Sequence, residues 1–100
     1  MSDPHQELDF LSDSTENTST RFVTFIGGSL KRFDLAVTTT NRFYGKKLVT
    51  DLHNGRTAIL GTDDLEEEGY LEHIYNLSEE EGIELRTFLY QVLGEPYFTD

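Results

Sequence analysis

The dipeptide Asn54-Gly55 is the feature that most constrains how this chain folds, because it lies between two segments of alternating apolar residues, KKLVTDLH and RTAIL. An Asn-Gly pair in this setting predicts a β-hairpin with a two-residue type I′ turn, in which both central residues have a positive φ. Such a turn pairs Leu52 with Thr57 and Thr50 with Ile59. Because side chains alternate across a strand, one face then carries Leu48, Thr50, Leu52, Thr57 and Ile59, and the other carries Asp51, His53, Arg56 and Ala58.

Two further strands are expected before this hairpin. The segments RFVTFI at 21–26 and RFDLAVTT at 32–39 are separated by a short Gly-Gly turn. In the second segment Phe33, Leu35 and Val37 alternate with more polar residues, which indicates one buried and one more polar face. Arg-Phe pairs recur at 21, 32 and 42, and a spacing of about ten residues fits one strand and one turn, with each pair at a strand start. The chain is therefore expected to form an antiparallel meander with strands at 21–26, 32–39, 46–53 and 56–60.

The last element is predicted to be a helix from Ser78 to Gly94. Ser78 and Glu81 form a capping box, and three glutamates in the first turn complement the positive end of the helix dipole. An apolar stripe at i, i+3, i+4 and i+7 follows, made of Leu85, Phe88, Leu89 and Val92. A stripe of this kind predicts a helix that packs its apolar side on the sheet.

The segments between the hairpin and this helix are less clearly patterned. The residues at 62–66 have helix-start features, so a single helical turn is expected there. The segment YLEHIYNL at 70–77 fits a helix through Leu71, Ile74 and Tyr75, and a strand through alternate residues, and its length after a glycine favours a strand. The predicted fold class is α+β: a four- to five-stranded antiparallel meander with one C-terminal helix packed on it.

One hundred residues suffice for one domain, which we place at 21–94. Residues 1–20 are rich in Ser, Thr, Asn and acids, and this composition predicts an acidic, largely disordered tail. Leu8, Phe10 and Leu11 are its apolar exceptions and could dock as a short edge segment. Residues 95–100 form a short C-terminal tail in which Tyr97-Phe98 either packs on the helix or docks elsewhere.

The chain carries a net charge of −11, with a basic block between two acidic ones. Residues 1–20 hold five acids and no base, 21–56 sum to +5, and 57–100 sum to −11. Either the acidic C-terminal part packs beside the basic sheet, or an exposed basic face meets an anionic partner. A net charge of this sign argues against general affinity for nucleic acid.

The chain has no cysteine and no apolar run long enough to span a bilayer, and its acidic start lacks the apolar region of a signal peptide. We therefore expect a cytoplasmic protein that does not enter a membrane.

Several residue clusters bear on chemistry. Asp51, His53 and Arg56 are a polar cluster in which a carboxylate orients an imidazole and a guanidinium binds an anion. The cluster has no partnered nucleophile, and the acids near Glu72 and His73 match no metal-binding spacing, so no cofactor, metal or catalytic residue is assigned. An acid/base enzyme or a metal-binding protein remains the weaker alternative, and the chain is expected not to be an enzyme.

Aromatic side chains among the bases suggest a second function, the binding of single-stranded nucleic acid by stacking on the sheet. The rings concerned are Phe22, Phe25, Phe33, Phe43 and Tyr44. No RNP1-like sequence accompanies them, and a helix-covered sheet needs most of these rings for its core.

A protein-interaction or regulatory module is the favoured interpretation. A small sheet covered by one helix can expose an edge strand that pairs with a partner peptide, or with the same edge of a second copy to form a homodimer. The predicted polar contact consists of Arg42, Tyr44, Lys46 and Lys47, which are adjacent in sequence and do not fit a core. The meander also places these residues opposite Asp63 and Asp64.

Across residues 20–93 the chain resembles a family of small uncharacterised cytosolic proteins of Gram-positive bacteria, known as a domain of unknown function. The resemblance rests on the phrases TRFV, RFDLA, YGKKLV and DDLEEEGYLEH. It implies a bacterial cytosolic origin, and it carries no activity, cofactor or catalytic residue over to this chain.

Overall fold

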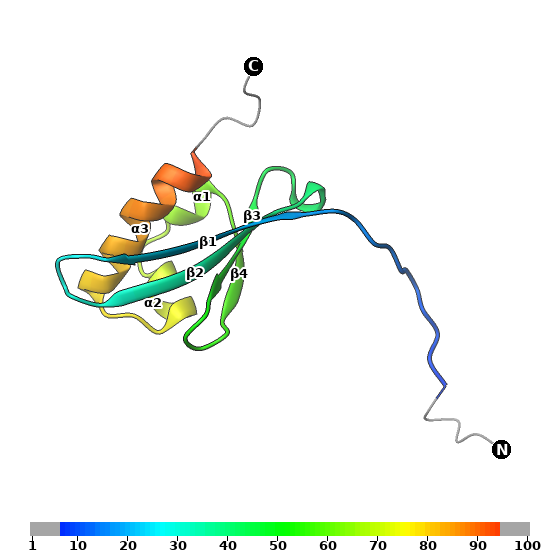
Figure 1. Ribbon diagram of the computed structural model, residues 1–100, viewed down its shortest axis with the longest axis horizontal. Helices are drawn as coiled ribbons and strands as arrows, with labels where there is room; N and C mark the ends of the chain where they lie inside the picture. Colours follow the sequence, from blue (N-terminus) through cyan, green and yellow to red (C-terminus); the bar gives the residue numbers. More distant parts are fainter. Residues whose placement is uncertain (1–6, 95–100) are drawn as a thin grey trace.

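A computed structural model describes residues 7–94 and shows a four-stranded antiparallel sheet with strand order β1-β2-β3-β4 (Figure 1). The strands are β1 (Ser19–Ile26), β2 (Arg32–Thr39), β3 (Lys47–Asp51) and β4 (Thr57–Leu60). Each strand follows its neighbour in the sequence, so the predicted meander is confirmed.

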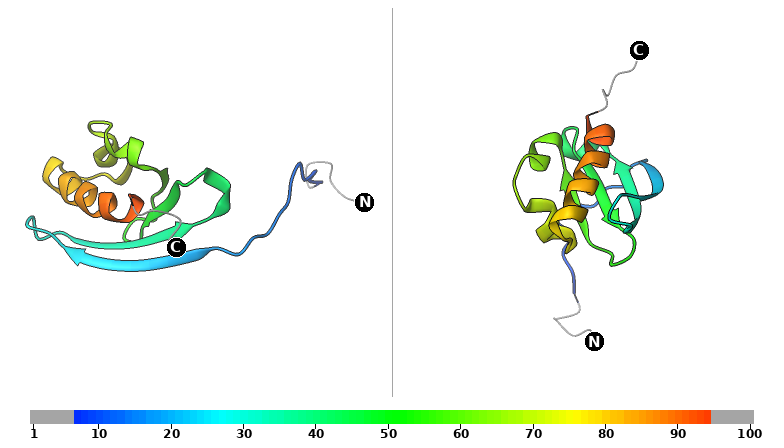
Figure 2. Two further views of the ribbon diagram at one scale, coloured as in Figure 1. Left: turned by 90° about the horizontal axis from the view of Figure 1, so that it is seen from above. Right: turned by 90° about the vertical axis from the view of Figure 1, so that its left-hand side faces the viewer.

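Three helices follow the sheet: α1 (Thr62–Leu65), α2 (Tyr70–Tyr75) and α3 (Glu79–Leu93). All three lie on the same side of the sheet, and the opposite side carries no helix within residues 7–94 (Figure 2). The α+β class is confirmed. α1 is the helical turn that was expected at 62–66, and α2 adds to the single covering helix that was expected. None of the helices in this part of the chain is long and apolar enough to cross a membrane.

The core lies between β2 and α3. Phe33, Leu35 and Val37 of β2 are buried, which confirms the alternation predicted for this strand. Leu85, Leu89 and Val92 of α3 meet them from the helix layer, and Phe88 is partly buried beside them. The remaining buried apolar side chains are Val49, Leu60, Leu65, Leu71, Tyr75 and Leu93.

Helix α3 begins as predicted. The Ser78 hydroxyl accepts a hydrogen bond of 3.1 Å from the Glu81 N–H, and the Glu81 carboxylate accepts one of 2.9 Å from the Ser78 N–H. This reciprocal pair satisfies two backbone donors that a helix start otherwise leaves unpaired. Helix α3 is therefore fixed at the end that lies nearest the β1–β2 turn.

The preference for a strand at 70–77 was wrong, because this segment forms α2. Gly69 enters the helix with a φ of +79°, and Asn76 ends it with a φ of +56°. Leu71 and Tyr75 are buried four residues apart, so the helical spacing rather than the alternation places the apolar side chains in the core. The Tyr75 hydroxyl also donates a buried hydrogen bond of 2.7 Å to the Val49 carbonyl of β3.

The predicted type I′ turn was also wrong, although the hairpin itself is confirmed. The Asp51 N–H donates to the Arg56 carbonyl, and Thr50 pairs with Thr57. The loop is therefore longer than two residues, and the strand register is shifted by two residues from the predicted one. Two side chains stabilise this loop: Asp51 accepts from the His53 N–H at 2.9 Å, and Asn54 accepts from the Arg56 N–H at 2.9 Å. Only Gly55 of the central pair has a positive φ. A shift of two keeps the side chains of the paired β3 and β4 residues on their predicted faces, whereas His53 in the loop turns away from Asp51 toward Asp34.

The third Arg-Phe pair does not begin a strand. Asn41–Phe43 forms a 3₁₀ turn between β2 and β3, capped by the Thr40 hydroxyl. Tyr44 follows it with a φ of 49°, a left-handed conformation that reverses the chain toward β3.

Residues 7–18 run without helix or strand before β1 begins at Ser19. Hydrogen bonds attach this segment to the body: Glu16 accepts from the Thr40 hydroxyl and from the Asn41 N–H, and Ser14 accepts from Arg42. Leu8, Phe10 and Leu11 are exposed rather than docked on an edge. The division at residue 20 stays a prediction, and the expectation for Tyr97-Phe98 lies outside the described residues.

Replacing Tyr75 by phenylalanine tests how α2 is attached to the sheet. Tyr75→Phe removes the hydrogen bond to Val49 and leaves the ring in place, so we expect the free energy of unfolding to fall by about 1 kcal/mol. Urea denaturation followed by circular dichroism measures this change. Tyr44→Phe is the matched control, because Tyr44 is fully exposed and its hydroxyl loss is expected to have no effect. Equal effects of the two substitutions would contradict the assignment.

Candidate functional site

Strand β1 is the long exposed edge of the sheet. Among the described residues it pairs with β2 alone, and it is eight residues long, whereas the opposite edge strand β4 has four. Asp34 of β2 accepts a backbone hydrogen bond from Leu52, so its backbone groups point toward β3. Because these directions alternate in an antiparallel ladder, the backbone N–H and C=O groups of Phe22, Thr24 and Ile26 point away from the sheet.

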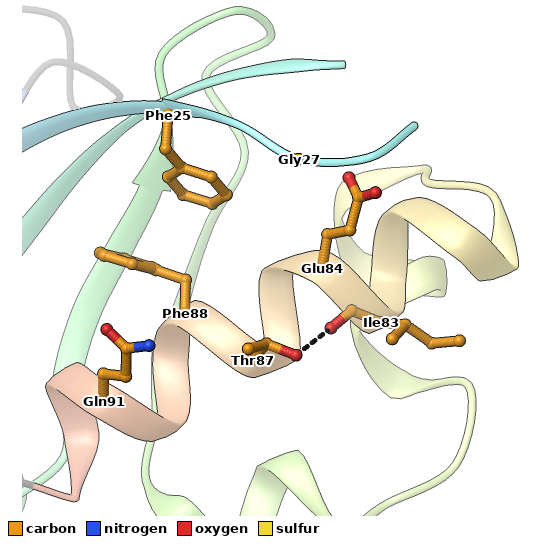
Figure 3. Close-up of a pocket in the computed structure, with 7 residues that line it drawn as sticks. All are labelled: Phe25, Gly27, Ile83, Glu84, Thr87, Phe88 and Gln91. Atoms are coloured by element: carbon orange, nitrogen blue, oxygen red, sulfur yellow. Dashed lines mark hydrogen bonds between the residues drawn. The ribbon is translucent and has the colours of Figure 1, made fainter. Parts of the chain in front are cut away.

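A groove of about 360 Å³ runs between β1 and α3 (Figure 3). Its lining residues come from both elements and from the start of the β1–β2 turn: Phe25, Gly27, Ile83, Glu84, Thr87, Phe88 and Gln91. Figure 3 shows the Phe25 ring and the Phe88 side chain pointing toward each other across the space between strand and helix. The groove is therefore an apolar slot directly beside the unpaired edge.

The groove walls are held in place by packing and hydrogen bonds. The Phe25 ring lies 4.8 Å from Phe33 and 4.8 Å from Phe88, centroid to centroid. The Glu84 carboxylate accepts hydrogen bonds of 2.6 Å from both the N–H and the hydroxyl of Ser29, so it joins α3 to the β1–β2 turn. Thr87 donates back to the Ile83 carbonyl at 3.0 Å (Figure 3). Contacts within the chain thus fix both walls of the groove.

The face of the sheet without helices is lined by threonine and by exposed apolar side chains. Thr20 and Thr38 share a hydrogen bond of 2.8 Å, as do Thr50 and Thr57 across the β3–β4 pair. Phe22 and Ile26 of β1 are 73% and 62% exposed on this face. Apolar side chains therefore lie on both sides of the β1 edge, in the groove and on the open face.

The predicted polar cluster does not form one site. Asp51 is 3% exposed and accepts from the His53 backbone. The His53 ring points elsewhere, with Nε2 lying 2.7 Å from a carboxylate oxygen of Asp34 on β2. Arg56 donates to the Ile74 carbonyl near the end of α2 at 3.2 Å. The three side chains have separate structural roles, and their geometry offers no shared substrate position.

Asp34 is the centre of a different polar group on the open face. It accepts a hydrogen bond from the Thr24 hydroxyl and lies 3.0 Å from Nε of Arg32. The Thr24 hydrogen bond is the main cause that lowers the pKa of Asp34, and the charges of Arg32 and His53 lower it further. The group connects β1, β2 and the β3–β4 loop.

The predicted partner-binding residues lie together at the end of the sheet away from the β1–β2 turn, but three of them are engaged within the chain. Lys46 lies 3.1 Å from Asp64 and 3.8 Å from Asp63, as the meander predicted, and the hydrogen bond to Asp64 raises the pKa of Lys46. Lys47 donates to the Val92 carbonyl, and Arg42 donates to Ser14. Tyr44 is fully exposed. Their role in partner binding stays a prediction.

A second hollow, of about 630 Å³, lies between α2 and α3 and is lined mainly by polar residues. Glu72 and Arg86 face each other there at 4.0 Å, and each has one buried polar atom without a hydrogen-bond partner in the described part of the chain. Within residues 7–94 no group of three or more His, Asp or Glu side chains is arranged to hold a metal ion.

The aromatic side chains considered for nucleic-acid stacking do not share a surface. Phe33 is buried, and Phe25 stacks on it under α3. Phe22 points to the open face, and Tyr44 follows the 3₁₀ turn between β2 and β3. The rings therefore do not form a common platform for successive bases.

The groove is not evident from the sequence. An edge strand was expected to be available, but nothing in the sequence showed that α3 lies beside β1 with a gap. Two apolar residues could have pointed to the groove. Ile83 lies outside the predicted apolar stripe of the helix, and Phe25 lies outside the alternating pattern of β2.

The model of the family described as SAV0927-like matches residues 11–91 of this chain. No curated protein matches it.

Asp34→Asn tests the polar group on the open face through its pH dependence. The folded-state pKa of Asp34 is lowered, so its contribution to stability is present above the ordinary value of 3.8 and is lost as the pH falls through the folded pKa. We expect Asp34→Asn to lower the melting temperature at pH 7, and the difference from the wild type to shrink below about pH 3.8. Thermal melts between pH 2 and pH 7 measure this. Glu67→Gln, which removes an exposed acid whose side chain has no described partner, is the control, and a difference independent of pH would contradict the prediction.

Proposed function

Since this chain belongs to the SAV0927-like family, whose description names no activity, we propose its function from the geometry: it is a small interaction or regulatory module that binds an extended segment of a protein partner at β1. The proposed cellular setting is the cytoplasm of a Gram-positive bacterium. The resemblance of the sequence and the lack of cysteine support this setting.

The observation that carries the proposal is the position of the groove beside the unpaired edge. An extended peptide that adds to a sheet edge gains affinity from main-chain hydrogen bonds and specificity from pockets for alternate side chains. Phe22, Thr24 and Ile26 supply the outward backbone groups, and the slot beside the Phe25 and Phe88 rings supplies an apolar pocket. Both requirements are met on one strand.

The groove supports this proposal better than the basic loop does. Arg42, Lys46 and Lys47 already form hydrogen bonds or ion pairs within the chain, and exposed charge pairs contribute roughly 0–1 kcal/mol each. A partner at that end of the sheet would have to replace these contacts. A partner at β1 meets backbone groups that face solvent and an open apolar slot.

The role of the β1 edge can be tested with proline at position 22. Phe22→Pro removes one outward N–H and keeps the β1–β2 hydrogen bonds, because proline is tolerated on an edge where its nitrogen faces solvent. Phe22→Ala is the matched control, since it also loses the ring but keeps the N–H. Circular dichroism establishes that both variants fold.

The probe is a phage-displayed library of random twelve-residue peptides, selected on the immobilised wild-type protein and followed by fluorescence anisotropy of enriched sequences. We expect enriched peptides with alternating apolar residues that bind Phe22→Pro about tenfold more weakly than Phe22→Ala, which corresponds to about 1.4 kcal/mol. Absence of enrichment, or equal affinity for the two variants, would overturn the proposed function.

A further inference from the structure

We propose that the occupant of the β1–α3 groove in the free protein is residues 7–13 of a second copy of this chain, exchanged reciprocally in a symmetric dimer. We call residues 7–13 the arm. This inference rests on the proposed function, because both place an extended segment along the outer edge of β1. Here that segment is the arm of a second copy.

The arm presents an apolar surface that its own copy does not cover. Leu8, Phe10 and Leu11 are 75%, 76% and 97% exposed. Three large apolar side chains within four residues are an unusual composition for a solvated segment, because such segments are normally poor in them. The arm belongs to no helix or strand of its own copy and bends at Leu11, so this bend has to straighten when the arm pairs as a strand.

The attachment of the arm directs it away from the groove of its own copy. Glu16 and Ser14 contact Thr40 to Arg42 at the end of the sheet that lies opposite the β1–β2 turn. Figures 1 and 2 show the arm leaving the body from that end, whereas Phe25 and Gly27 of the groove lie toward the other end. An arm that turned back along its own β1 would have to break these contacts, so a second copy is the occupant.

Charge complementarity supports the same occupant. Within residues 7–94, two basic side chains form neither an ion pair nor a hydrogen bond: those of Arg21 and Lys31. The Lys31 ammonium lies over the Phe33 ring, 5.3 Å from the ring centroid. Arg21 and Lys31 lie at the two ends of the β1 edge. The arm carries Asp9 and Asp13 on either side of Leu11 and contains no base. In a chain with a net charge of −11, these two cations are therefore available to an acidic segment.

The alternation of the arm matches one antiparallel register with β1. With Leu11 opposite Phe25, the Leu11 side chain faces the groove and Phe10 lies opposite Ile26 on the open face. The same register places Asp13 opposite Val23, next to Arg21, and Asp9 opposite Gly27, near Lys31. Phe10 and Ser12 then face Ile26 and Thr24, whose backbone groups point outward. Hydrogen bonding and apolar contact agree in this register, and it brings Asp13 near Arg21 and Asp9 near Lys31.

Engineered cysteines test the register directly, because the chain has no cysteine of its own. We expect the variant Phe10→Cys/Ile26→Cys to form dimers under mild oxidation, with position 10 of one copy linked to position 26 of the other, since residues that pair across strands lie within disulfide distance. Non-reducing electrophoresis and mass spectrometry of the linked peptides measure this. The matched control is Phe10→Cys/Ile59→Cys, because Ile59 is on the same face at the opposite edge strand. We expect no link between positions 10 and 59.

Light scattering with size-exclusion chromatography provides the second measurement. The wild type is expected to be a dimer that dissociates on dilution, and Leu11→Asp, which introduces a charge at the groove, is expected to be a monomer at the same concentration. Leu52→Asp, a charge on another exposed apolar position, is expected to leave the dimer intact.

Three results would overturn the arm exchange. The first is a wild-type monomer at all concentrations, and the second is a link from position 10 to 26 within one copy. The third is a dimer that survives Leu11→Asp, which would indicate direct pairing of two β1 edges instead. The library peptides separate this failure from that of the proposed function: if they bind Phe22→Ala better than Phe22→Pro while the arm stays unlinked, β1 binds partners and the arm does not.

Discussion

The stack of Phe33, Phe25 and Phe88 is the interaction on which the rest of the structure depends. Phe33 is in the buried centre of the β2 face, Phe25 extends the aromatic surface to the edge strand, and Phe88 brings α3 against it at 4.8 Å. Offset or tilted aromatic pairs contribute about 0.5–1.5 kcal/mol beyond the area they bury. Because the stack reaches β1, it keeps α3 over the edge of the sheet, and the space that remains beside the two rings is the groove. The core and the candidate site therefore share residues.

Electrostatics explains how a chain with so many acids folds and which charges remain available. The acidic part after β4 approaches the basic sheet through Lys46 and Asp64, and the acidic N-terminal segment approaches through Arg42 and Glu16. Internal compensation is thus present, which is the first of the two interpretations that the charge pattern allowed. The compensation leaves Arg21 without an ion pair among the described residues, on the strand whose outer edge is unpaired.

The parts of the fold that were predictable are those determined by local periodicity. β2 was recognisable because alternate residues are buried on one face, and α3 because its cap and its stripe agree. The register of the β3–β4 hairpin was not predictable from Asn54-Gly55, since hydrogen bonds to the Asp51 and Asn54 side chains stabilise a longer loop. Helix α2 was missed because its segment fits two periods, and only contact with Val49 and the core decides between them. The groove was beyond sequence patterns, because it depends on how far α3 lies from β1 and not on either element alone.

The two edges of the sheet are protected to different degrees, and this difference gives β1 its significance. β4 has four residues and runs directly into α1, so its edge is short. β1 has eight residues, STRFVTFI, with one arginine and no lysine, proline or glycine. Long edge strands that lack lysine, proline and glycine pair readily with other chains. Proteins that do not use such an edge for binding usually interrupt it or cover it. A strand that combines this edge with exposed Phe22 and Ile26 and an apolar groove supports the proposed binding at β1, because water can satisfy its backbone groups while exposure of its apolar side chains to water is unfavourable.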